Sequence, residues 1–306
     1  MPTICCSFLT FNIEIRGPQA ILDMLQREYG NVGALRNPRV TFTITIHQRT
    51  RSFPASPQPY HFDPASGILR LIWLDGAINV EVDYTARHVE AWITRSVQTS
   101  AAIANWVITI PLSELLRPFD YHFIHAAGLV REGRGILFGG RSGQGKTTLA
   151  LGLIEQGWTL ISDDDLFITP TPDDWRVVSG PEPVKATPQT AARFPQWCRP
   201  LSAATGKQRV SLPPACRIAE LNGGLIAVGF ITPAERTRWR RLTPRAAYER
   251  LLNLAWLPAH PDYSRRTLAV LHRLVHTLTP FELHFGLDFA DLSNQLAAII
   301  GEITRP

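Results

Sequence analysis

A glycine-rich segment near the middle of the chain has the residue types that hold a phosphate group. Gly140 is followed by four residues and then by Gly145, Lys146 and Thr147, which is the Walker A pattern. Glycines let backbone N–H groups point at phosphate oxygens, the lysine contacts the β- and γ-phosphates, and the threonine hydroxyl binds Mg²⁺. The segment therefore predicts a site for ATP and Mg²⁺ made of Gly140, Arg141, Ser142, Gly143, Gln144, Gly145, Lys146, Thr147 and Thr148.

The sequence on either side fits a strand before this segment and a helix after it. Residues 136–138 predict the strand, and residues 148–156 predict a helix with Leu149, Leu153 and Ile154 on one buried face. The alternative is an ordinary glycine turn without a ligand. Because motif, strand and helix coincide, we expect a nucleotide site whose helix N-terminus attracts phosphate.

Three consecutive carboxylates, Asp163, Asp164 and Asp165, follow the next apolar run at residues 158–162. Ligands of α/β sheets gather beyond the carboxyl ends of the strands. If this strand returns beside residues 136–138, a carboxylate lies next to the phosphates, where it can hold Mg²⁺ or accept the proton of an attacking hydroxyl. The alternative is that the acids only cap a turn.

Residues 124–168 resemble the catalytic domain of the HPr kinase/phosphorylase family, whose nucleotide fold is akin to that of phosphoenolpyruvate carboxykinase. The similar stretch, which begins IHAAGLV and ends SDDDLFI, is about a seventh of the chain and holds several motifs in the same order and spacing. The resemblance implies a P-loop α/β core of this type and an ATP-dependent kinase.

The resemblance also implies roles for single residues. His125 matches an active-site histidine that helps to organise the phosphate site, although from the chain alone it is a buried strand histidine. Lys146 matches the loop lysine, and Thr147 matches the magnesium hydroxyl, which is normally a serine. Asp163 and Asp164 match the paired aspartates, of which the second accepts the proton of the substrate hydroxyl. We therefore expect a catalytic set of His125, Lys146, Asp163 and Asp164, with Thr147 and Asp163 as metal ligands.

Departures from the family bear on the acceptor. Thr148 stands where HPr kinases have an acidic residue, and neither their downstream arginine-glycine signature nor their usual accessory domain is visible. A closer likeness is to HPr-kinase-related proteins that modify peptides, including lasso-peptide tailoring kinases. Lys185 would match a lysine of those proteins, and Lys207 or Arg209 falls in a similar basic stretch. The implied partner is a peptide or protein acceptor, such as a precursor peptide.

The elements that must position these residues are expected to form two regions. In residues 1–118, VTFTITI at 40–46 alternates apolar and polar residues, which predicts a strand. Further strands are expected at residues 68–74, 78–82, 89–94 and 106–110, so this region is expected to be mainly β.

Residues 119–306 are expected to form the P-loop catalytic domain with a helical C-terminal part. Strand, glycine loop and helix follow one another in the order of an α/β sheet, which is the predicted fold class. The proline-rich residues 170–200 are expected to be irregular. Helices are expected at residues 246–256, 267–279 and 289–300.

Composition limits the remaining possibilities. The net charge of +5 favours anionic ligands but does not establish nucleic-acid binding. An arginine cluster at residues 236–245 is expected to be a solvated helix face or loop, and binding of an acidic peptide or a nucleic acid is its alternative. No apolar run approaches the ~18 residues of a membrane span. The four cysteines lack metal or disulfide spacing. We expect a cytoplasmic protein without a membrane or nucleic-acid partner, and self-association into a homo-oligomer is left open.

These features predict a kinase that transfers the γ-phosphoryl group of ATP to a hydroxyl, with a serine of a peptide or protein as the leading acceptor. A small-molecule hydroxyl is the alternative acceptor. The alternative outside the enzyme class is a non-catalytic module that binds ATP and a peptide. Such a binder needs Lys146 and Thr147 but has little use for the carboxylate of Asp164.

Overall fold

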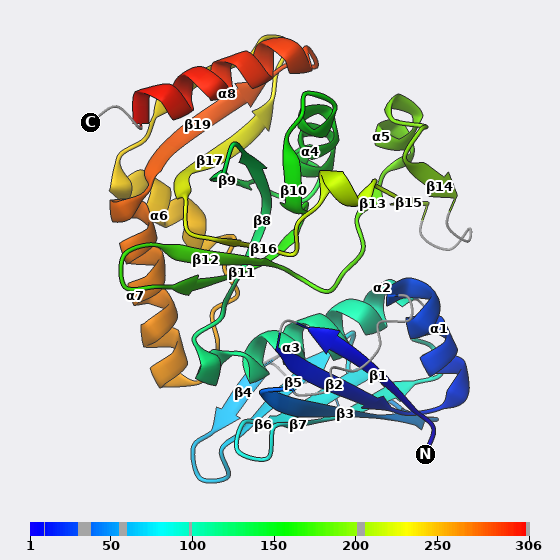
Figure 1. Cartoon of the computed structure of the whole chain (residues 1–306). Helices are drawn as coiled ribbons and strands as arrows, with labels where there is room; N and C mark the ends of the chain where they lie inside the picture. Colours follow the sequence, from blue (N-terminus) through cyan, green and yellow to red (C-terminus); the bar gives the residue numbers. More distant parts are fainter. Residues whose placement is uncertain (9, 30–37, 55–59, 98–99, 201–205, 304–306) are drawn as a thin grey trace. The chain divides into compact units, whose positions relative to one another are not determined.

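The computed structural model describes the chain apart from residues 9, 30–37, 55–59, 98–99, 201–205 and 304–306. The chain forms two compact units (Figure 1). The first comprises Met1–Phe119 with Pro181–Pro183 and Pro258–Ser264, and the second comprises Asp120–Gly180, Val184–Leu257 and Arg265–Pro306. Both combine helices with sheets, so the predicted α/β class is confirmed as a mixed α/β structure.

The sheet of the first unit has seven strands in the order β1-β2-β3-β7-β6-β5-β4. β2, β3 and β7 are parallel, and the other neighbours are antiparallel. Alternation in β3 buries Phe42, Ile44 and Ile46, as its pattern predicts. The strands are β1 (Thr3–Phe8), β2 (Phe11–Arg16), β3 (Val40–Arg49), β4 (Tyr60–Asp63), β5 (Ile68–Trp73), β6 (Ile78–Asp83) and β7 (His88–Thr94).

One strand predicted in this region is wrong. Residues 106–110 lie in a continuous helical stretch made of α2 (Ser100–Ile103), the π-helix η1 (Ala104–Thr109) and α3 (Ile110–Leu115). Val107, Ile108 and Thr109 are all buried, and a short apolar run fits a buried helix as well as a buried strand. The other described helices of this unit are α1 (Gln19–Tyr29) and the short 3-10 helix η2 (Arg117–Phe119). The region is therefore a sheet with helices packed on it, rather than β structure alone.

The sheet of the second unit positions the candidate site. Its order is β16-β12-β11-β8-β9-β17-β19-β18, with β10 also paired to β8. β9, β17 and β19 are parallel to one another, and their other neighbours are antiparallel. The strands are β8 (His122–Arg131), β9 (Arg134–Gly139), β10 (Thr159–Ser162), β11 (Asp165–Pro170), β12 (Trp175–Ser179), β16 (Glu220–Asn222), β17 (Leu225–Pro233), β18 (Arg238–Arg241) and β19 (Thr279–Phe285).

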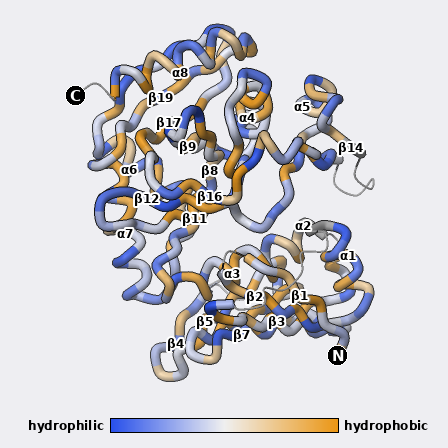
Figure 2. Tube along the Cα trace, in the orientation of Figure 1, coloured by the Kyte–Doolittle hydropathy of each residue, from blue (hydrophilic) through white to orange (hydrophobic). Residues whose placement is uncertain are grey.

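Helices cover both faces of this sheet. α4 (Lys146–Glu155) and α8 (Phe289–Ile303) pack on the face that carries Ile136 and Phe138. α6 (Pro244–Leu252) and α7 (Pro261–Thr277) pack on the face that carries Leu137. Ile136, Leu137 and Phe138 of β9 thus enter opposite cores in turn, which is why this part of the strand is apolar throughout. Figure 2 shows hydrophobic stretches in the strands of this sheet.

The predicted C-terminal helices correspond to α6, α7 and α8, although α6 already ends at Leu252 and α7 already begins at Pro261. The prediction of a helical C-terminal part is incomplete, because the same part supplies β17, β18 and β19. None of the helices in the described part of the chain combines the length and apolar character that crossing a membrane requires.

The expectation of an irregular segment at residues 170–200 is also wrong. The segment contains β12, β13 (Lys185–Ala186), α5 (Pro188–Arg193) and β14 (Cys198–Pro200), and β15 (Gln208–Val210) joins β13 and β14 in a small sheet. Pro188 stands at the start of α5, where a helix needs no N–H donor, and the Thr187 hydroxyl caps that end by accepting from Thr190 N–H at 3.3 Å. The short 3-10 helix η3 (Pro214–Cys216) follows.

The expectation of a helix face or loop holds for only two members of the arginine cluster, because Arg245 lies on α6 and Arg236 in a bend. The other three lie on β18, which ends the strand order of the sheet. Arg240 donates to Glu282 at 2.6 Å, Arg241 lies 3.8 Å from Glu302, and Arg245 lies 3.2 Å from Glu249 on α6. Charged side chains on a final strand discourage pairing with further strands.

Candidate active site

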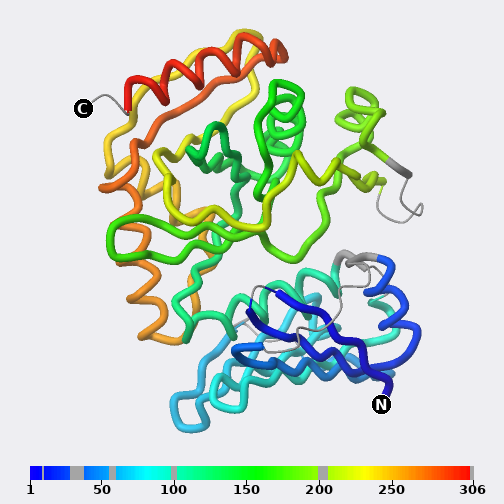
Figure 3. Tube along the Cα trace, in the orientation of Figure 1, coloured from blue at the N-terminus to red at the C-terminus, as the bar shows by residue number. Residues whose placement is uncertain are grey.

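The glycine-rich segment joins the end of β9 to the start of α4 (Figure 3). Gly143 and Gly145 have φ angles of 83° and 84°, in the left-handed region that favours glycine. A Cβ atom on Gly145 would lie 2.9 Å from Cζ of Phe285. Within the loop, the Arg141 N–H donates to Oε1 of Gln144 at 2.6 Å. The loop therefore has a glycine-dependent curve directly before a helix N-terminus.

Lys146 is buried in the first turn of α4, and its ammonium group has three partners. Nζ donates to the Gly140 carbonyl at 2.9 Å, lies 3.0 Å from Nε2 of His125 and lies 3.2 Å from Oδ1 of Asp164. An ammonium has three hydrogens, so each partner can accept one. The side chain is 5% exposed, and a charge buried to this degree is costly unless it is paired. The loop, β8 and the acidic segment thus meet at this ammonium.

Thr147 contacts a different carboxylate. Its hydroxyl donates to Oδ2 of Asp163 at 2.7 Å. Burial raises the pKa of Asp163 to about 7, the nearby Asp164 charge acts in the same direction, and the Thr147 hydrogen bond opposes both. A hydroxyl and a carboxylate therefore lie together at the start of α4.

The raised pKa of Asp163 predicts a pH-dependent stability. The pKa of this carboxyl group is ordinarily 3.8, as in an unfolded chain, and is about 7 in the folded protein. The folded state therefore binds the proton more tightly than the unfolded state. The stabilisation from protonation is complete below about pH 4 and is lost as pH rises through about 7. Burial also raises the pKa of Asp165, so the contribution of Asp165 to stability likewise falls as pH rises. In EDTA, Asp163→Asn should therefore resist urea better than the wild-type protein at pH 8 and differ little from it at pH 4.

The effect is measured by comparing the urea midpoints of the two proteins across this pH range. The difference in their free energy of unfolding should be on the order of a few kcal/mol, because one pKa unit corresponds to about 1.4 kcal/mol. Asp173→Asn, which removes an exposed carboxylate, is the matched control and should follow the wild-type curve. An Asp163→Asn curve that runs parallel to the wild-type curve would show that another group titrates.

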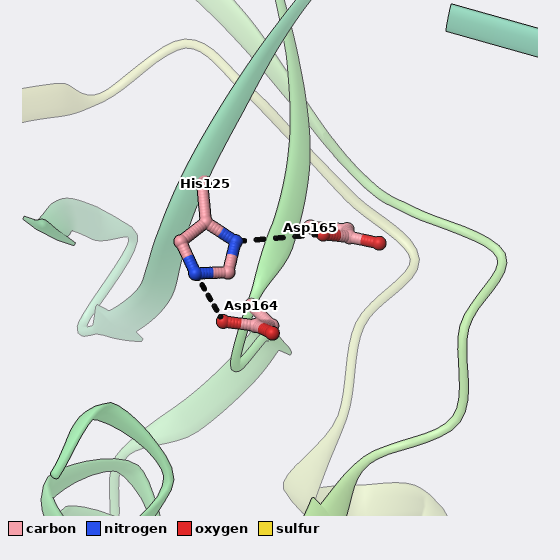
Figure 4. Close-up of side chains that lie close together, drawn as sticks. All are labelled: His125, Asp164 and Asp165. Carbon is pink, nitrogen blue, oxygen red and sulfur yellow. Dashed lines mark ion pairs between the residues drawn. The ribbon is translucent and has the colours of Figure 1, made fainter. Parts of the chain in front are cut away.

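His125 lies in β8 directly opposite Asp165 of β11. Opposite residues of an antiparallel pair place their side chains on the same face, and Nδ1 of His125 lies 3.8 Å from Oδ1 of Asp165. At the other ring nitrogen, Nε2 lies 3.1 Å from Oδ1 of Asp164. Figure 4 shows the imidazole ring between the two carboxylates. The Asp164 side chain is 51% exposed and that of Asp165 is 12% exposed, so only the former is open to a second substrate.

A bend between β10 and β11 allows two consecutive acids to reach one histidine. Both strands pair with β8, so the apolar run before the acids lies beside β8 and not beside residues 136–138 of β9. The register shifts between Leu160 and Ser162, and Asp163 and Asp164 occupy the bend that follows. Because regular alternation is broken here, Asp163 contacts Thr147 while Asp164 contacts His125 and Lys146.

Not every residue expected in the site joins this cluster. The Thr148 hydroxyl lies 2.8 Å from the Thr190 hydroxyl of α5, away from the lysine. Lys185 and Arg209 lie opposite each other in β13 and β15. The structure thus brings together His125, Lys146 and Asp164, with the Thr147–Asp163 pair next to them in sequence.

The oxygen donors of Thr147 and Asp163 fit Mg²⁺, which prefers hydroxyl, carboxylate and phosphate oxygens. A second group, formed by His125, Asp164 and Asp165, has ligand atoms within 4.8 Å of one another. The Lys146 ammonium already lies 3.0 Å and 3.2 Å from two of those ligand atoms and would repel a cation. The Thr147–Asp163 pair is therefore the better candidate for a divalent metal.

Asp165 is the member of this cluster that could be predicted from the sequence only as one of three consecutive acids, without a role of its own. Its partner His125 is distant in the chain, and the contact depends on the antiparallel register of β8 and β11. The available signal was weak: a third acid at the first position of an otherwise apolar strand, where aspartate is unfavourable.

Comparisons with known proteins leave the family of this chain open. No family model matches the sequence, and no curated protein matches it either. Among solved structures, the HPr(Ser) kinase/phosphatase from Coxiella burnetii aligns with 59% of this chain and 94% of its own, at 11% sequence identity and a TM-score of 0.33. A TM-score this low does not establish a common fold, and this identity does not transfer an activity.

Proposed function

We propose that the chain is an ATP-dependent phosphotransferase that transfers the γ-phosphoryl group to a hydroxyl, with a serine of a peptide or protein as acceptor. The observation that carries the proposal is the meeting of Lys146, Asp164 and His125 beside the glycine loop, with neighbouring atoms 3.0 to 3.2 Å apart. A glycine loop alone serves binders and enzymes alike. A half-exposed carboxylate beside the buried lysine suits contact with a second substrate.

The loop would bind the phosphates of ATP. Its backbone N–H groups and the N-terminus of α4 attract anions, and Lys146 adds a positive charge for the β- and γ-phosphates. Held by Thr147 and Asp163, Mg²⁺ would neutralise charge that builds up on the phosphate oxygens. Phosphates that attract Lys146 weaken its pairing with Asp164, so nucleotide binding leaves that carboxylate more available.

Asp164 would orient the acceptor hydroxyl and take its proton. The hydroxyl oxygen forms a bond to the γ-phosphorus, the bond from that phosphorus to ADP breaks, and the hydroxyl proton passes to the carboxylate late in the reaction. His125 touches the same carboxylate oxygen at 3.1 Å and so restricts where Asp164 can point. This arrangement supports transfer to a hydroxyl rather than binding alone.

The choice of a serine acceptor rests on the resemblance of residues 124–168 to HPr kinases and to their peptide-modifying relatives. The experiment incubates the protein with ATP, Mg²⁺ and either serine-containing peptides or hydroxylated metabolites, and mass spectrometry follows ADP and phosphate adducts. We expect adducts on peptide serines. Adducts confined to metabolites would reassign the acceptor, and tight ATP binding without ADP or adducts would identify a binding module.

A further inference from the structure

Asp165 is a buried carboxylate that neither the phosphates nor the acceptor would contact. It begins β11, and the next two residues, Leu166 and Phe167, are fully buried. Burial of a carboxylate is costly unless it is paired. Among the described residues, the basic group within 4 Å of this carboxylate is Nδ1 of His125, at 3.8 Å. The buried position of Asp165 is therefore explained best by its interaction with Nδ1 of His125.

The contacts at the other ring nitrogen indicate which tautomer of His125 is present. A lysine ammonium only donates, so its 3.0 Å hydrogen bond with Nε2 requires a lone pair on that nitrogen. The carboxylate oxygen Oδ1 of Asp164, 3.1 Å from the same nitrogen, also only accepts, and the ammonium lies close enough to donate to both acceptors. A neutral imidazole then carries its hydrogen on Nδ1, which faces Asp165. The 3.8 Å separation exceeds a direct hydrogen bond, and contacts of this kind often shorten when substrates bind.

The main chains of both partners are fixed. The Asp165 carbonyl accepts a hydrogen bond from Gly180 N–H at 2.7 Å, and a Cβ atom on Gly180 would lie 2.6 Å from Cβ of Asp165. The His125 N–H donates to the Leu254 carbonyl at 2.8 Å. Because the backbone cannot shift easily, the orientation of the ring depends on the side-chain contacts at its two nitrogens.

We propose that Asp165 is a positioning residue that holds His125 in the Nδ1–H tautomer and so directs the Nε2 lone pair towards Lys146 and Asp164. The opposite tautomer would point an N–H group at the ammonium. The inference rests on the proposed function, in which the Nε2 lone pair accepts a hydrogen bond from Asp164 after Asp164 has taken the acceptor proton. Carboxylate partners that fix the tautomer of a metal-bound histidine are worth roughly 10- to 100-fold, and we expect an effect of the same order here.

The test compares the wild-type protein with Asp165→Asn, which keeps the shape, and Asp165→Leu, which removes the acceptor. Asp174→Asn is the control, because among the described residues the Asp174 carboxylate accepts only from the backbone N–H groups of Trp175 and Gly224. The first readout is the NMR spectrum of labelled histidine rings at about pH 8.5, where histidine is ordinarily neutral, with His125→Gln used for assignment. The second is kcat and KM for ATP in phosphoryl transfer.

We expect the Nδ1–H tautomer of His125 in the wild-type and control proteins and a shift towards Nε2–H in both Asp165 variants. We also expect kcat to fall roughly 10- to 100-fold while KM for ATP changes little. A wild-type Nε2–H tautomer, or an unchanged tautomer and kcat in Asp165→Leu, would overturn the inference. If the tautomer responds but no protein transfers phosphate, the proposed function fails and the positioning role stands. If Asp165→Leu does not fold, Asp165→Ala, which also lacks an acceptor, decides.

Discussion

Replacement of Asp164 by asparagine is expected to slow phosphoryl transfer by roughly 10²- to 10⁴-fold, the usual effect of losing a general base. Asparagine has the size of aspartate but cannot take the acceptor proton. Binding of ATP should change little, because the loop and Lys146 provide the expected phosphate contacts. Removal of the carboxylate 3.2 Å from the Lys146 ammonium even leaves that charge freer for the phosphates. The measurements are the rate of phosphate transfer and the Kd for ATP.

Asp163→Asn is the informative comparison, because its carboxylate contacts Thr147 and is buried. It should raise the Mg²⁺ concentration that gives half of the maximal rate, which Asp164→Asn should alter much less. Full transfer by Asp164→Asn beside an inactive Asp163→Asn would exchange the two roles. Full transfer by both variants would remove the acidic segment from the mechanism.

Lys146→Ala is expected to reduce turnover on the order of 10³-fold, because the phosphates lose a positive charge as negative charge shifts during transfer. It should also weaken ATP binding, unlike Asp164→Asn. The Gly140 carbonyl, Nε2 of His125 and Oδ1 of Asp164 each lose a donor in this variant. Lower thermal stability is therefore expected as well, by about 1–3 kcal/mol for each polar group left buried and unpaired.

Rates and ATP binding per folded molecule separate the loss of charge from the loss of stability. Arg70→Ala is a suitable control, because Arg70 lies in the first unit, is paired with Glu81 and is 51% exposed. It should leave both measurements at the wild-type level. Wild-type turnover in Lys146→Ala would exclude the glycine loop as the phosphate site.

The features predicted well from the sequence depend on local patterns. The glycine spacing with its flanking strand and helix, and the alternation that buries Phe42 and Ile44 in β3, are each encoded within a few neighbouring residues. The resemblance to HPr kinases implied that Thr147 and Asp163 are metal ligands, and the structure places the Thr147 hydroxyl 2.7 Å from Oδ2 of Asp163.

The features that escaped prediction depend on contacts between distant parts of the chain. Residues 106–110 are rich in β-branched residues, which favour a strand, but they belong to a buried helical stretch whose packing overrides that preference. The high proline content of residues 170–200 led to the expectation of an irregular segment. Proline is nevertheless compatible with the first turn of a helix, where Pro188 lies in α5. The contact between Asp165 and His125 requires the register of β8 and β11, which no local pattern encodes.

The fate of the γ-phosphoryl group tests the central claim most directly. ATP labelled with heavy oxygen in its γ-phosphate is incubated with the wild-type protein, Mg²⁺ and serine-containing peptides, and the products are analysed by mass spectrometry. We predict labelled phosphate on serine hydroxyls, ADP in equal amount, and near-complete loss of both in Asp164→Asn. ATP that binds through Lys146 but is recovered intact, with no label on any acceptor hydroxyl, would contradict a phosphotransferase and indicate a nucleotide-dependent binding protein.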